Sequence, residues 1–114
     1  MATDFIQVLT TVDDEARAHD LARAAVEARL AACGQVLGPM RSVYWWQGQV
    51  ETATEWLVLL KSRRDVYPDL EALLRREHPY DTPEILAVPI EAGLDAYLTW
   101  MQRTLRPRSS PRPL

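Results

Sequence analysis

Residues 33–61, CGQVLGPMRSVYWWQGQVETATEWLVLLK, decide the fold of this chain. Their apolar residues recur with a period of two, which predicts one strand over 33–46 and a returning strand from Val50 to about Lys61. Trp46-Gln47-Gly48-Gln49 predicts the turn between them, because glycine accepts a positive φ. Gly38-Pro39 interrupts the first strand and predicts a bulge or bend. The segment is therefore expected to be a long hairpin.

This hairpin is too long and too apolar for a single subunit to cover. Fourteen residues in the first strand extend about 45 Å, at roughly 3.3 Å each, whereas a helix of about eighteen residues covers only about 27 Å. Period two places Trp56, Val58 and Leu60 on one face, and Leu57 and Leu59 on the other. We expect an obligate homo-oligomer in which the uncovered faces pack together. The alternative is a twisted hairpin that curls back on itself and leaves its tryptophans partly exposed.

The flanking segments complete an α+β order of elements. Before the hairpin we expect a buried strand over 5–12 and an alanine-rich helix that begins at Asp13-Asp14-Glu15 and closes at Cys33-Gly34. After the hairpin we expect a helix from near Asp65, capped by the box Ser62-Arg63-Arg64-Asp65, then a stop at His78-Pro79, a buried strand over 85–90 and a helix after Gly93. The order β-α-β-β-α-β with an added helix predicts a ferredoxin-like sandwich.

Length and composition set further limits. The 114 residues suit one domain, expected over 1–105, and the Pro- and Arg-rich residues 106–114 predict a disordered tail. The domain carries ten basic and sixteen acidic residues, a net charge of −6, which argues against a nucleic-acid partner. No apolar run approaches the roughly 20 residues of a membrane span, and none follows Met1 as a signal peptide. The single cysteine excludes an internal disulfide and favours a reducing cytoplasm.

Five motifs follow one another in an order typical of one family. They are Arg29-Leu30-Ala31-Ala32-Cys33, Ser42-x-Tyr44-x-Trp46-x-Gly48-x-Val50-Glu51, Leu60-Lys61, His78-Pro79-Tyr80-Asp81-Thr82-Pro83-Glu84-Ile85 and Pro89-Ile90-x-x-Gly93. With them the chain resembles the CutA family of divalent-cation tolerance proteins, from Phe5 to Gln102. The resemblance implies a ferredoxin-like subunit, a homotrimer, a link to copper and other divalent metals, and an architecture similar to the PII signalling proteins. Gly34 and Gln35 stand where the family commonly carries Val and Asn.

Three residues are candidate metal ligands. The Cys33 thiolate suits copper or zinc, and His78 and Glu84 supply borderline and hard donors. Their spacing matches no metal motif, so the alternatives stay open. Cys33 is equally consistent with a small buried side chain at a helix end, and His78 with an imidazolium that caps the helix it ends. His19 is expected to be solvated.

A second candidate site comprises polar and amphipathic motif residues, namely Tyr44, Trp46, Glu51, Lys61 and Tyr80, with Glu84 beside them. In one interpretation the aromatic residues pack in an interface, and Glu51 forms a solvated pair with Lys61. In the other, these residues line a cleft between subunits that holds a small anion or a metal complex. Lys61 is the only lysine in the chain, and its ammonium differs from a guanidinium in shape and hydration.

The sequence contains no nucleophile elbow, phosphate loop or zinc-hydrolase motif, so a non-enzymatic protein is expected. The leading hypothesis is a cytoplasmic homotrimer that binds a divalent metal ion, copper in particular, and takes part in the response to metal ions. Membranes and nucleic acids are not expected as partners. The alternative is a PII-like signalling trimer that binds a small metabolite between its subunits, and a third possibility is a scaffold whose role is assembly alone.

Overall fold

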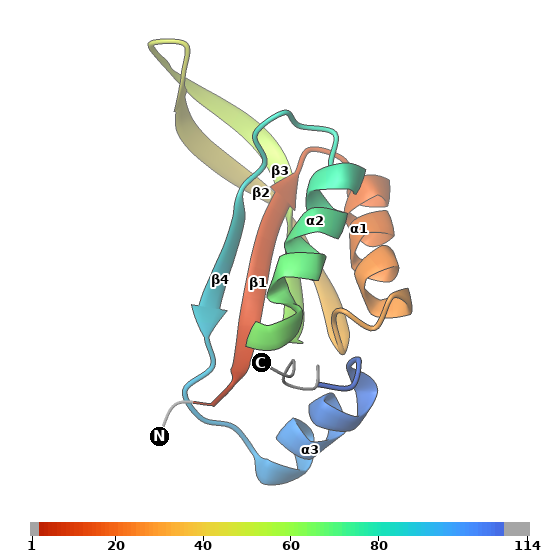
Figure 1. The fold of residues 1–114 in the computed structure, drawn as a ribbon. Coiled ribbons are helices and arrows are strands. Elements are labelled where there is room, and N and C mark those ends of the chain that lie inside the picture. Colours follow the sequence, from red (N-terminus) through yellow and green to blue (C-terminus); the bar gives the residue numbers. More distant parts are fainter. Residues whose placement is uncertain (1–2, 109–114) are drawn as a thin grey trace, which may run out of the picture.

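The computed structural model describes residues 3–108, which form one antiparallel sheet with helices on one face and at one end. The elements are β1 (Phe5–Val12), α1 (Glu15–Glu27), β2 (Cys33–Trp46), β3 (Gln49–Arg63), a short 3-10 turn (Arg64–Val66), α2 (Tyr67–Glu77), β4 (Ile85–Pro89) and α3 (Asp95–Thr104). The strand order β2-β3-β1-β4 makes this the predicted ferredoxin-like α+β fold with a C-terminal helix. Figure 1 shows α1 and α2 side by side on the sheet and α3 below it.

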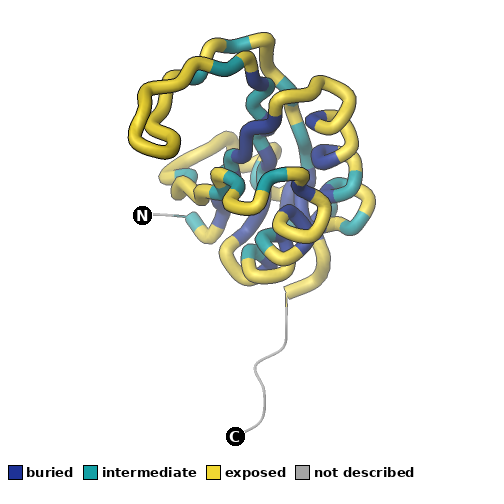
Figure 2. Tube along the Cα trace, turned by 90° about the horizontal axis from the view of Figure 1, so that it is seen from above, coloured by how far each residue is buried: buried dark blue, intermediate teal, exposed yellow. Residues whose placement is uncertain are grey.

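The β2–β3 hairpin has the predicted first strand, turn and bend, and its returning strand extends one residue earlier and two residues later than predicted. Cross-strand pairing runs from Cys33 with Lys61 to Trp46 with Gln49, and the register shifts between Leu37 and Met40, next to Gly38-Pro39. Gln47 and Gly48 both have positive φ, at 49° and 78°, as a two-residue turn of the hairpin type requires. The hairpin extends beyond the helices (Figure 1). Residues 43–52, at its tip, are all exposed (Figure 2).

The two faces of the sheet differ in what covers them. Cross-strand partners share a face, so Val8 and Leu60 lie on the side covered by α1 and α2, where both are fully buried. The opposite face remains open over most of its area. Its apolar residues are half-buried or exposed, and they are Leu9, Leu37, Leu57, Leu59, Leu86 and Val88. An uncovered apolar sheet face is thus present in the single subunit.

The helix α1 begins as predicted and ends earlier. Asp14 is its N-cap, with the side chain accepting a hydrogen bond from the Arg17 backbone N–H at 3.0 Å. The predicted end at Cys33-Gly34 is wrong, because Arg29 adopts a left-handed φ of 59° and turns the chain back toward the sheet. Cys33 consequently opens β2 instead of closing a helix.

Gly34 lets α1 approach β2 closely. A Cβ at this position would lie 3.0 Å from the Ala22 Cβ and 3.2 Å from a Leu60 methyl. The chain therefore carries glycine where a valine would collide with the alanine-lined face of α1.

The second half of the chain differs from the expectations at two places. The box at Ser62–Asp65 does not cap α2, since β3 continues to Arg63 and α2 starts at Tyr67 with no side-chain cap. The strand β4 is an edge strand with mostly exposed residues and ends at Pro89, so the prediction of a buried strand over 85–90 is wrong. The helix expected after Gly93 is present as α3; its Met101 is buried, whereas Leu94, the residue before it, is 74 % exposed.

α3 closes the end of the sheet that lies away from the hairpin turn. It packs Met101 and Leu105 against Phe5 and Ala32 in a small apolar cluster, separate from the main core beneath α1 and α2. Ordered contacts continue past the predicted domain end at 105, because the Arg106 backbone N–H donates to the Arg29 carbonyl oxygen at 3.0 Å. The rest of the predicted tail, residues 109–114, lies outside the described residues. Among residues 3–108 there is no helix that combines the length and apolarity needed to cross a bilayer.

Candidate functional site

A cleft of about 840 Å³ opens where the hairpin leaves the body of the subunit. Its walls come from four segments that are distant in the sequence: the end of β1, the distal half of β2, the middle of β3 and the loop between α2 and β4. The lining residues are Thr11, Ser42, Val43, Tyr44, Trp46, Glu55, Tyr80, Asp81, Thr82, Pro83 and Glu84. This volume is typical of small-molecule sites.

Glu55 is the buried charge of the cleft. It lies in β3, on the same face as Leu57 and Leu59, and only 8 % of it is exposed. The Tyr80 hydroxyl donates a hydrogen bond to its Oε2 at 2.9 Å. Burial raises the pKa of the Tyr80 phenol strongly, and the Glu55 hydrogen bond and charge raise it further. Tyr80 is therefore neutral at physiological pH and acts as a donor to the carboxylate.

His78 holds the loop that carries Tyr80. Its backbone N–H caps α2 by donating to the Leu74 carbonyl at 2.9 Å. The ring is buried, its Nδ1 accepts from the Tyr80 backbone N–H at 3.1 Å, and its Nε2 is 2.8 Å from the Thr11 carbonyl oxygen. Since Nδ1 accepts, Nε2 carries the proton and donates, and the imidazole is neutral. His78 thus caps α2 as expected, but with its backbone N–H; its ring connects the loop to β1 and does not bind a carbonyl of its own helix.

The structure gathers some of the predicted cleft residues and separates others. Tyr44, Trp46 and Tyr80 line the cleft. Glu51 is exposed and pairs across the hairpin with Tyr44, outside the lining. Lys61 lies near the other end of β3, where its Nζ donates to Gln35 Oε1 at 2.8 Å. Because ten residues of one strand separate them, the pair expected between Glu51 and Lys61 does not form.

The three candidate metal ligands also lie apart. Cys33 pairs with Lys61, whereas the Thr11 carbonyl bonded by His78 belongs to a residue that pairs with Leu57. Four residues of β3 span about 13 Å, so Cys33 lies far from the Thr11 carbonyl that the His78 ring contacts. Glu84 lines the cleft. Within residues 3–108, no three Cys, His, Asp or Glu residues converge as a metal site would require, so one subunit does not fit a resident metal ion.

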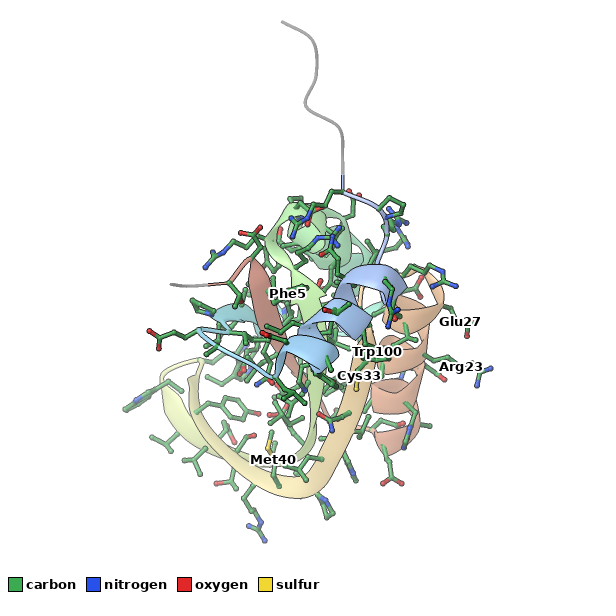
Figure 3. The ribbon with its side chains drawn as sticks, turned by 90° about the horizontal axis from the view of Figure 1, so that it is seen from below. Phe5, Arg23, Glu27, Cys33, Met40 and Trp100 are labelled. Carbon is green, nitrogen blue, oxygen red and sulfur yellow. The ribbon has the colours of Figure 1, made fainter. Side chains whose placement is uncertain are left out.

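Cys33 sits beneath α3 (Figure 3). The thiol is half-buried and lies beside the Tyr97 phenol, whose pKa is raised by burial first and by the neighbouring sulfur second. The Cys33 side chain therefore packs against α3 and is not part of the main core.

Sequence analysis did not single out Arg63, the second buried charged side chain of β3. It is fully buried under α3 and forms an ion pair with Asp65 through Nε and, at 2.9 Å, through Nη2. It also donates to Gln102 Oε1 at 3.2 Å and to the Arg106 carbonyl at 2.7 Å. The Arg63 guanidinium lowers the pKa of Asp65. The signal in the sequence that could have indicated its burial is the alternation along β3, which places Arg63 and Glu55 on the same face as the apolar Leu57 and Leu59.

Comparisons with known proteins agree with this fold. The CutA1 divalent ion tolerance protein family matches residues 6–104. The chain belongs to the CutA1 family. A divalent-cation tolerance protein CutA from Pectobacterium atrosepticum is 42% identical over 103 residues, which cover 90% of this chain and 94% of that relative.

CutA1 proteins of known structure share the whole architecture. The divalent cation tolerance protein (Cut A1) of Thermus thermophilus superimposes with a TM-score of 0.87 at 39% identity, over 90% of this chain and 99% of that one. A periplasmic divalent cation tolerance protein CutA from Archaeoglobus fulgidus gives a TM-score of 0.86 at 32% identity, over 90% and 99% of the two chains. This chain is accordingly a non-enzymatic divalent-cation tolerance protein, and membership of the CutA1 family does not by itself fix a compartment.

Proposed function

We propose that this CutA1 protein acts in divalent cation tolerance as a homotrimer, and that it binds a divalent metal ion, copper in particular, with donors from more than one subunit. The observation that carries the assembly is the uncovered hairpin and open sheet face. Trp45 is 74 % exposed and Trp46 is 59 % exposed, on opposite faces of the hairpin, and Val50, the cross-strand partner of Trp45, is 57 % exposed. Contiguous apolar surface of this kind marks an interface, and a second copy of the chain offers the same surface in return.

Light scattering on a sizing column tests the assembly. We expect a mass three times the 13.0 kDa of the chain at micromolar concentration. Trp45→Asp should shift the mass to that of the single chain, because it places a charge in the proposed interface. Leu94→Asp is the matched control, since Leu94 is also 74 % exposed but precedes α3. A trimer that is unaffected by Trp45→Asp and dissociated by Leu94→Asp would place the contact at α3 and contradict the proposal.

The metal part of the proposal follows from membership of the CutA1 family and from the separation of donors within one subunit. Because Cys33 and Glu84 do not meet in one chain, copper uptake is expected to depend on assembly. Equilibrium dialysis against copper and zinc should show binding to the trimer and its loss in Cys33→Ala or Glu84→Ala. The Trp45→Asp protein should also lose binding. Unchanged stoichiometry in both ligand variants would remove these two residues from the metal site.

The cleft favours a second candidate, a PII-like signalling role in which a small metabolite binds where subunits meet. Tyr44, Trp46 and Tyr80 surround a cavity of ligand size next to the open face. A ligand that binds only the folded trimer raises its unfolding midpoint, so a thermal-shift screen of metabolites tests this role.

We propose a cytoplasmic location with no nucleic-acid or membrane partner, based on the single cysteine and the acidic domain.

A further inference from the structure

We propose that the cleft binds a small organic cation through an ammonium or guanidinium group, with Glu55 as the charge partner and the rings of Tyr44 and Trp46 beside the ligand. The inference names the ligand class of the small-metabolite role proposed above and rests on that role.

Glu55 carries the first step, because it is a buried carboxylate without a cation. With 8 % of the residue exposed, it has lost most of its hydration. Its recorded partner is the neutral Tyr80 hydroxyl, and within residues 3–108 no Lys, Arg or His nitrogen lies within 4.0 Å of it. Arg63 shows how this chain treats a buried charge elsewhere, with an acidic partner and two further acceptors. A buried carboxylate with one neutral donor is stabilised by an incoming cation.

The remaining lining selects the kind of cation. Asp81 and Glu84 add acidic groups, and the negative charge of Asp13 also acts on Tyr80. The lining contains no Lys, Arg or His, so its electrostatic potential attracts cations and repels anions. This ligand class differs from the small anion or metal complex considered for the cleft from the sequence, and Lys61 lies outside the lining, bonded to Gln35.

The aromatic walls favour an organic cation over a metal ion. Indole and phenol rings attract ammonium and guanidinium groups by cation–π interaction, whereas a divalent ion needs several converging oxygen, nitrogen or sulfur donors. The acidic side chains of the cleft do not converge in that way within the described residues. A volume of about 840 Å³ also exceeds what a bare ion requires.

Isothermal titration calorimetry on the full chain, with a chelator present, tests the inference with three four-carbon probes. We expect 1,4-diaminobutane to bind, and the neutral 1,4-butanediol and the anionic succinate to give no saturable heat. Binding of the diamine should weaken as salt is added. Glu55→Gln should weaken it about tenfold or more, because the buried charge is the anchor. Trp46→Leu should weaken it about threefold or more, by loss of a cation–π wall.

The matched control is Glu51→Gln on the same hairpin, since Glu51 is exposed and outside the cleft lining. Its diamine affinity should equal that of the wild type. Absence of diamine binding to a protein of confirmed trimeric mass would overturn the ligand class and leave the assembly and the tolerance role intact. Succinate binding would overturn it too, as would equal weakening by Glu51→Gln and Glu55→Gln. A monomer that still binds the diamine through Glu55 would instead contradict the assembly.

Discussion

The middle and the C-terminal end of β3 each hold one buried charged side chain, and the surroundings of the two differ. Glu55 and Arg63 lie on the same face of the strand, eight residues apart, which is about 26 Å. Arg63 is enclosed by α3 and bonded to an acid, an amide and a backbone carbonyl. Glu55 faces a cleft and accepts one bond from Tyr80. Arg63 finds all its partners in its own subunit and stabilises the fold. Glu55 has no cationic partner in the subunit, so a cationic ligand can supply one.

The largest effect is expected from removing the enclosed charge. Arg63→Met keeps much of the volume but leaves Asp65, Gln102 and the Arg106 carbonyl without their donor. We expect a loss of about 3–5 kcal/mol in the free energy of unfolding, the usual cost of breaking a buried ion pair from one side. Denaturant unfolding at one fixed protein concentration measures it, because the stability of an oligomer depends on concentration.

Arg64→Met is the control for this change. Arg64 is the next residue in the chain, is exposed and begins the 3-10 turn. Its replacement should alter stability by no more than about 0.5 kcal/mol. Equal losses in the two variants would mean that the Arg63 contacts contribute nothing beyond a surface charge.

A smaller effect is expected at the cleft end from His78→Phe. The phenyl ring fills the buried space but leaves the Thr11 carbonyl and the Tyr80 backbone N–H without partners. We expect a loss of about 2–3 kcal/mol and weaker diamine binding, because the loop that carries Tyr80 is released. The exposed His19, changed to Phe, should leave both quantities near the wild-type values. Unaltered stability in His78→Phe would show that these two bonds do not hold the loop.

Acid should weaken the α3 end through Asp65. Arg63 lowers the pKa of this carboxyl in the folded protein below the usual 3.8. The folded state therefore binds fewer protons than the unfolded state as the pH falls below that value, and the stabilisation present at neutral pH is lost. Asp65→Asn should cost about 2 kcal/mol at pH 6. The difference in the free energy of unfolding between the variant and the wild type should then become smaller as the pH falls below 4, measured by denaturant titration at each pH. A difference that does not change with pH would contradict this role of Asp65.

The sequence predicted the hairpin, its turn at Gln47-Gly48 and the order of elements, because these depend on local periodicity and turn chemistry. The end of α1 was mispredicted since the left-handed Arg29 has no local signal. Lys61 lies away from the cleft because ten residues of β3 separate it from Glu51, and membership of a shared motif does not imply closeness along a strand. Glu55 was missed because its burial comes from Tyr80, twenty-five residues away.

The smallest stability change, and the sharpest test of the comparison, is expected from Glu55→Gln without ligand. The amide removes a buried charge that lacks a cation, and its oxygen still accepts from Tyr80. The substitution removes the cost of burying a charge, and it also weakens the hydrogen bond from Tyr80. We expect these two changes to be of similar size, so the free energy of unfolding should change by less than about 1 kcal/mol. Tyr80 should show the loss of that charge: its pKa, raised in part by Glu55, should fall in an alkaline absorbance titration. If Glu55→Gln instead cost as much as Arg63→Met, Glu55 would be a structural charge with its partners already in place, and the two buried charges of β3 would be alike.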